Sequence, residues 1–134
     1  MSDKVVGKDI LKPKDVHWIV NAFFKKVRKD ELLSPFFADN SKADWESFLI
    51  VMCSFWENVL FYTGGYFGNP MQRHQEMHEL QTFSEIHFAR WLELFCISVD
   101  LKFAGTNAEI MKERARHIAT IMQVKLSQQS KAGL

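Results

Sequence analysis

Residues 15–33 read DVHWIVNAFFKKVRKDELL, and this stretch predicts an amphipathic helix. Its apolar residues recur three and four positions apart, which places them on one face of a helix. They are Val16, Ile19, Val20, Phe23, Phe24 and Val27. Pro13 and Asp15 suit the beginning of a helix, and Ser34-Pro35 ends the run. A short apolar corner should follow at Pro35-Phe36-Phe37.

The same helical spacing returns in three later stretches, residues 41–62, 84–103 and 107–125. In the last of these we expect Ile110, Ile118, Ile121 and Met122 to face inward. A glycine-rich loop covers residues 63–69, and Pro70 should open a short helix. No stretch alternates convincingly with period two. The pattern therefore predicts an all-α fold whose longer helices pack around one core.

Length and composition indicate a single domain over residues 1–134, with a core at about residues 12–125 and frayed polar termini. The chain has 12 Phe but 2 Tyr, and such an apolar interior suits a flat apolar ligand. A formal net charge of +1 favours neither nucleic acid nor an anionic membrane, and no apolar stretch is long enough to cross a bilayer. Cys53 and Cys96 are isolated, which predicts reduced, buried thiols and a cytoplasmic protein.

Two of the five histidines, His74 and His78, follow Pro70 closely and lie four residues apart. Histidines at this spacing share one helix face and could bind zinc together. A metalloprotease would need Glu directly after the first histidine, where this chain has Gln75, and spacing identifies no third ligand. Zinc hydrolysis is therefore disfavoured. We interpret His17, His87 and His117 as solvated or core-edge side chains.

Four segments, in the right order over residues 12–125, resemble the group III truncated hemoglobins. Residues 23–37 resemble their second helix and corner, and residues 45–56 resemble their distal helix. Residues 66–74, Tyr-Phe-Gly-Asn-Pro-Met-Gln-Arg-His, resemble the segment that ends at the proximal histidine. Residues 88–95, Phe-Ala-Arg-Trp-Leu-Glu-Leu-Phe, resemble their G-helix signature.

This resemblance implies a truncated globin, a two-over-two helical sandwich around haem b, with His74 as the iron ligand. It places haem-contacting aromatic side chains at Phe37, Phe55, Trp56 and Trp91. Tyr66 and Arg73 become candidate donors to the haem propionates. His78 stays an alternative ligand or a residue at the haem edge.

The resemblance also identifies three distal positions at which this chain lacks hydrogen-bond donors. Phe24 stands where the family often has Tyr, Phe48 stands where it often has His, and Met52 is apolar too. Of the expected distal residues only Trp91 carries a donor, its indole N–H. We therefore expect weak or fast dioxygen binding, less effect on carbon monoxide, and five-coordinate ferric iron.

The resulting hypothesis is a cytoplasmic, monomeric globin that reversibly binds dioxygen, carbon monoxide and nitric oxide. The alternative is a haem enzyme for nitric oxide dioxygenation or peroxide chemistry, which would need a reductase partner. Peroxide chemistry usually requires distal acid–base groups, and Phe24 and Phe48 supply none. A third possibility is a helical interaction module in which His74 is merely structural.

Overall fold

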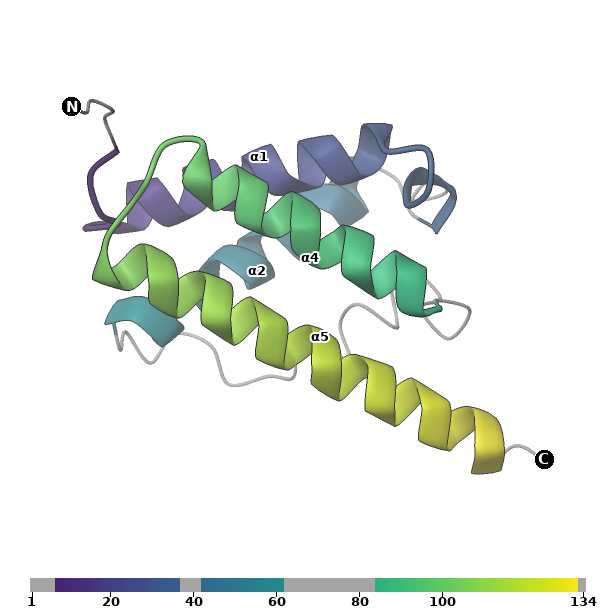
Figure 1. The fold of residues 1–134 in the computed structure, drawn as a ribbon. Coiled ribbons are helices and arrows are strands. Elements are labelled where there is room, and N and C mark those ends of the chain that lie inside the picture. The colour runs from purple at the N-terminus through teal and green to yellow at the C-terminus, as the bar shows by residue number, and fades with distance from the viewer. Residues whose placement is uncertain (1–6, 37–41, 62–83, 133–134) are drawn as a thin grey trace.

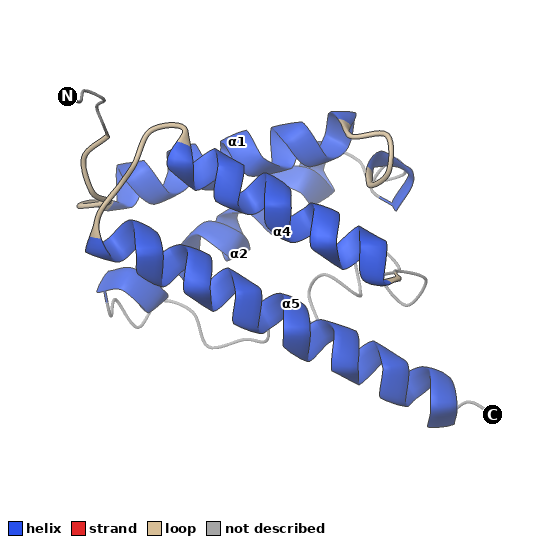
Figure 2. Ribbon diagram, in the orientation of Figure 1, coloured by secondary structure: helices blue, strands red, loops and turns tan. Residues whose placement is uncertain are grey.

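A computed structural model describes residues 7–36, 42–61 and 84–132. Side chains are described for residues 7–36, 45–61 and 84–124. The helices are α1 (Pro13–Lys29), the short 3₁₀ helix η1 (Ser34–Phe36), α2 (Lys42–Phe61), α4 (Glu85–Asp100) and α5 (Thr106–Ala132). Figure 2 shows helices joined by loops, and the described residues contain no named strand. The expectation of an all-α fold is confirmed.

The four long helices of the described segments pack around one core, each against two others. Helix α1 packs against both α2 and α4, and α5 packs against both α4 and α2. Figure 1 shows α4 running beside α1 and above α5, with α2 behind them. This is the expected two-over-two globin-like arrangement, and it encloses a core to which all four helices contribute.

Two aspartates define the ends of α1. Asp15 Oδ2 accepts hydrogen bonds from the backbone N–H groups of Leu11 (2.9 Å) and Lys12 (3.2 Å). At the other end, Asp30 Oδ2 accepts from the N–H groups of Leu32 and Leu33. Such a local bond competes with the helix, so α1 ends at Lys29 and not at the expected Leu33.

The inward face of α1 is confirmed, whereas that of α5 is confirmed only in part, because Met122 is buried and Ile118 is half-buried against the core. All six apolar residues expected to face inward from α1 are buried. On α5, however, Ile110 and Ile121 are 42% and 39% exposed. The buried residues of α5 are mostly small: Ala108, Met111, Ala115, Ala119 and Met122. Alanine side chains allow close approach between helices, so packing of α5 is decided by size as well as hydrophobicity.

The segment before α1 is tied to the beginning of α5. Asp9 accepts hydrogen bonds from the backbone N–H groups of Asn107 and Ala108, both at 2.9 Å, and so caps α5. The side chain of Asn107 donates in return to the carbonyl of Ile10, which is fully buried. Gly105 adopts a φ of 140°, and a Cβ there would lie 2.5 Å from the Asp9 side chain. The packed structure thus begins before residue 12, and α5 continues past residue 125 to Ala132.

Among the described residues, no helix combines the length and hydrophobicity that crossing a membrane would require.

Candidate functional site

A small internal cavity lies where α1, α2, α4 and α5 meet. Its volume is about 20 Å³, enough for roughly one water-sized molecule. Its wall is almost entirely apolar and is formed by Val20, Phe23, Phe24, Met52, Phe55, Trp56, Trp91, Phe95 and Ile118. Because none of the described residues that line it is charged, this cavity suits a small apolar guest better than an ion.

Five of the site residues expected from the sequence line this one cavity: Phe24, Met52, Phe55, Trp56 and Trp91. Phe48 is not among the residues that line this cavity, but it packs against one of them. Its ring is fully buried and meets the Phe24 ring edge to face, with 5.0 Å between centroids. The ring of Trp45 packs against both of these phenylalanines at 5.7 Å.

An aromatic cluster makes the cavity wall rigid. The Phe95 ring stacks on the Trp56 ring of α2, with 5.1 Å between centroids and 24° between the planes. It also stacks with the Trp91 ring of its own helix, with 6.1 Å between centroids and 10° between the planes. The edge of Phe23 from α1 meets the rings of both Trp91 and Phe95. Such ring pairs contribute about 0.5–1.5 kcal/mol each beyond the area they bury. The cluster thereby fixes three helices around the cavity.

The polar chemistry of this wall is sparse. Phe24, Phe48 and Met52 are all buried, and their side chains have no hydrogen-bond donor. Trp91 does carry a donor, and its indole Nε1 is buried. The positions of Phe24 and Phe48 therefore offer neither a phenol nor an imidazole, and the side-chain N–H groups of the described wall residues are the indoles of Trp56 and Trp91.

Four residues of the wall were not singled out from the sequence as site residues: Val20, Phe23, Phe95 and Ile118. All four lie on helix faces that the apolar spacing marks as buried. Spacing shows that a residue faces the core, but it does not show where the core is hollow. A cavity depends on how side chains from separate helices fill the space between them.

The remaining expected site residues are Phe37, Tyr66, Arg73, His74 and His78, and all lie outside the described residues. The assignment of His74 as the iron ligand therefore stays a prediction. Within the described ranges, no group of three or more His, Cys, Asp or Glu side chains could hold a metal ion.

Three other titratable groups of the described segments, His17, His87 and Cys53, have a structural partner or are buried. His17 Nε2 lies 2.5 Å from Glu57 Oε2, which links α1 to α2. The Nδ1 atom of His87 accepts a hydrogen bond from the backbone N–H of Ser84 at the beginning of α4. Burial, with a smaller contribution from the charge of Glu57, raises the pKa of the Cys53 thiol to about 12. That thiol is unreactive at neutral pH, as expected for a buried cysteine.

Comparison with known proteins identifies the family. Over 108 residues the chain is 30% identical to the group 3 truncated hemoglobin ctb of Campylobacter jejuni, covering 78% of this chain and 83% of that protein. The chain belongs to the group 3 truncated hemoglobins. The crystal structure of the group III truncated hemoglobin from Campylobacter jejuni superposes with a TM-score of 0.76 at 26% identity, covering 90% of this chain and 95% of that chain. A scan against protein-family models gives no match.

Membership of this family makes the chain a haem-binding globin, and the described residues fit that group. A truncated hemoglobin needs an apolar interior that shields a flat macrocycle from water. The aromatic cluster of α1, α2 and α4 supplies such an interior, with a cavity at its centre.

Proposed function

We propose that this truncated hemoglobin binds haem b through His74 and reversibly binds dioxygen, carbon monoxide and nitric oxide beside an apolar distal wall. The haem supplies an iron coordination position for a diatomic gas. The support for the gas-binding part is the internal cavity, because it has room for about one small molecule and its wall comes from the helices that carry the expected distal residues. His74 is proposed from the Pro-Met-Gln-Arg-His sequence of residues 70–74.

The distal wall determines how strongly a polar gas is held. Phe24 and Met52 line the cavity with apolar side chains, and the Phe48 ring packs against the Phe24 ring. From these positions neither phenylalanine nor methionine can donate a hydrogen bond to a bound gas. Because dioxygen gains more from such bonds than carbon monoxide does, the wall discriminates against dioxygen retention. A fast reversible binder results.

The decisive experiment measures haem uptake by wild type and His74→Ala after reconstitution with hemin. Pyridine-hemochrome spectra identify haem b and give its stoichiometry, and ferrous samples are then titrated with carbon monoxide. We expect wild type to bind one equivalent and His74→Ala to lose most of it, with partial recovery on adding imidazole.

Two further histidine variants make the result specific. His78→Ala tests the alternative ligand, and His117→Ala changes an exposed histidine of α5. Both should bind haem as wild type does. Full haem uptake by His74→Ala together with loss of haem in His78→Ala would assign the iron-ligand role to His78. A wild type that takes up no haem would refute the proposal altogether.

A further inference from the structure

Positive charge is concentrated on α1 and its N-cap. Residues 12–29 contain six Lys or Arg and one Asp, which gives this segment a formal charge of +5. The whole chain carries +1, so the other residues together carry −4. The small net charge therefore conceals a strongly basic segment, and the electrostatic field around α1 should attract anionic groups.

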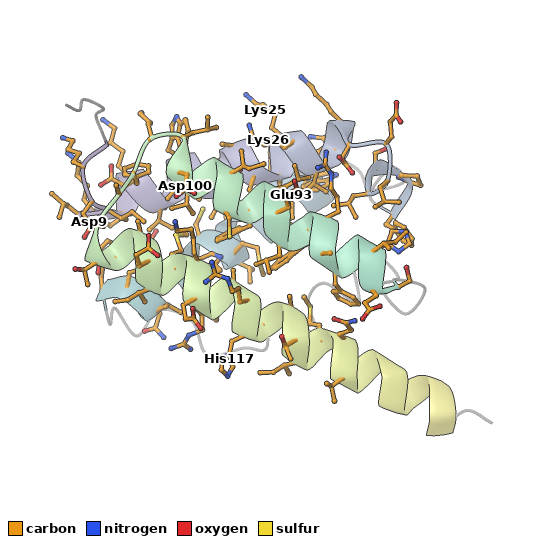
Figure 3. All side chains as sticks on the ribbon, in the orientation of Figure 1. Asp9, Lys25, Lys26, Glu93, Asp100 and His117 are labelled. Atoms are coloured by element: carbon orange, nitrogen blue, oxygen red, sulfur yellow. The ribbon has the colours of Figure 1, made fainter. Side chains whose placement is uncertain are left out.

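Four of these cations line one groove on the outer face of α1, and we call it the lysine groove. It has a volume of about 650 Å³, and its cations are Lys14, Lys25, Lys26 and Lys29. Trp18, and Leu101 from just after α4, line it as well. The lysines span about 22 Å along the helix axis. Figure 3 shows Lys25 and Lys26 projecting from the side of α1 that faces away from α5.

The charge of the lysine groove is not neutralised within the described part of the chain. None of the ion pairs between described residues uses one of the four lysines. Neighbouring carboxylates are already engaged, because Asp100 accepts from Lys112 Nζ at 2.7 Å and Glu57 is paired with His17. Three of the lysines are exposed and Lys26 is half-buried, so a partner can reach all four.

The shape and chemistry of the lysine groove favour an acidic protein segment over a membrane or a nucleic acid. The groove is concave, and its one well-exposed large apolar residue is Leu101, so it has little to insert into lipid. The Lys102 ammonium lies 4.7 Å from the centroid of the Trp18 ring and occupies the face on which a base would stack. All four groove cations are lysines, whereas the bidentate recognition of phosphate favours arginine.

We propose that the lysine groove docks an acidic segment of a partner protein, whose carboxylates pair with the four lysines. The apolar surfaces of Trp18 and Leu101 would contact the segment between these pairs. Charge complementarity of this kind mainly accelerates association, and salt weakens it. The opposite face of α1 lines the internal cavity, so the docked segment would lie one helix away from it. Docking requires no haem, so this inference is independent of the proposed function.

The test uses a fluorescein-labelled helical peptide of Glu and Ala, about 20 residues long so that it spans the groove. Fluorescence anisotropy measures its binding to the full chain, with and without haem, at low and at physiological ionic strength. We expect binding at low ionic strength that weakens as salt is added. A peptide with Gln in place of every Glu should not bind.

Two double variants locate the binding site. Lys25→Gln/Lys29→Gln should weaken binding about fivefold, because it removes two exposed charge pairs. Arg114→Gln/Arg116→Gln removes the same charge from exposed positions on α5 and should bind as wild type does. Lys25→Glu/Lys29→Glu should lose more affinity than the neutral variant. Glutamine is a good helix former, and circular dichroism checks that each variant keeps its helices.

The proposal is overturned if the peptide does not bind wild type at low ionic strength. Equal weakening by the α1 and α5 double variants would attribute binding to net charge and would also overturn it. The same titrations are run with an oligothymidylate of similar length and with vesicles of phosphatidylglycerol and phosphatidylcholine. Tighter binding of either of these than of the peptide, lost in Lys25→Gln/Lys29→Gln, would assign the groove to nucleic acid or to a membrane instead.

Discussion

The edge of the Phe48 ring packs against the Phe24 ring, with 5.0 Å between the centroids and 80° between the planes. This contact joins α1 to α2 at the wall of the internal cavity. In the proposed function, Phe24 and Phe48 form an apolar pair at two positions where the family often has Tyr and His. The character of the distal wall can therefore be tested by restoring one polar group at a time.

Phe24→Tyr should slow dioxygen release from the ferrous protein by about tenfold, because one added hydrogen bond is worth on the order of 1 kcal/mol or more. The hydroxyl would extend from a ring that already lines the cavity. Stopped-flow mixing with a dioxygen scavenger measures the rate, and carbon monoxide release serves as the internal control because it should change less. Very slow dioxygen release from wild type, or an unchanged rate in the variant, would contradict an apolar distal wall.

Phe48→His should change the ferric protein from five-coordinate to six-coordinate iron near neutral pH. Phenylalanine cannot bind iron or hold a water on it, whereas imidazole can do either. Optical and resonance Raman spectra of the reconstituted ferric protein distinguish the two states.

The matched control for this change is Leu49→His. Leu49 is the next residue on α2 but lines a groove with His17 and Glu57 on another side of the helix. We expect its spectrum to stay five-coordinate. A six-coordinate wild type would show that the distal side already supplies a ligand, and would refute the role assigned to Phe48.

Residue spacing along the chain was sufficient to predict the four long helices of the described segments, and the resemblance to the group III truncated hemoglobins identified five of the nine described residues of the cavity wall. Spacing was insufficient for α5, because the periodicity of isoleucines competes there with a face of alanines. Ala108, Ala115 and Ala119 are buried, while Ile110 and Ile121 are 42% and 39% exposed. Hydrophobicity ranks isoleucine above alanine, but the space between two close helices admits only the smaller side chain. The cap that Asp9 provides to α5 could not be predicted from residue spacing either, since Asp9 and Asn107 lie 98 residues apart in the sequence.

The contrast on α5 between buried alanines and exposed isoleucines gives a stability prediction. Ala115 is 0% exposed, so Ala115→Leu should overpack the core and cost about 1–3 kcal/mol of unfolding free energy. Both residues are good helix formers, so helix propensity does not confound the comparison. Ile110→Ala, at a position 42% exposed, should cost less than about 1 kcal/mol. Urea unfolding measures both values, and the opposite order would restore the isoleucine face as the core.

Asp9→Ala should lower the unfolding free energy by about 1 kcal/mol at neutral pH, because it removes the cap of α5. The effect should depend on pH. Burial raises the pKa of Asp9, but hydrogen bonds from the backbone N–H groups of Asn107, Ala108 and Ile10 outweigh it, so the pKa lies below its usual value. A carboxyl group with a lowered folded-state pKa stabilises the protein above its unfolded-state pKa, and this contribution disappears as the pH falls through the folded-state pKa.

The difference in stability between wild type and Asp9→Ala should therefore be constant at neutral pH and shrink below about pH 4, where the carboxylate begins to protonate. Glu31→Ala provides the control, because Glu31 is an exposed carboxylate just beyond α1. Its difference from wild type should stay near zero at every pH. Urea unfolding between neutral and acidic pH measures all three proteins. If the Asp9→Ala difference keeps its full size well below pH 4, an ionised Asp9 carboxylate is not what holds the segment before α1 against the beginning of α5, and packing of Ile10 must do so instead.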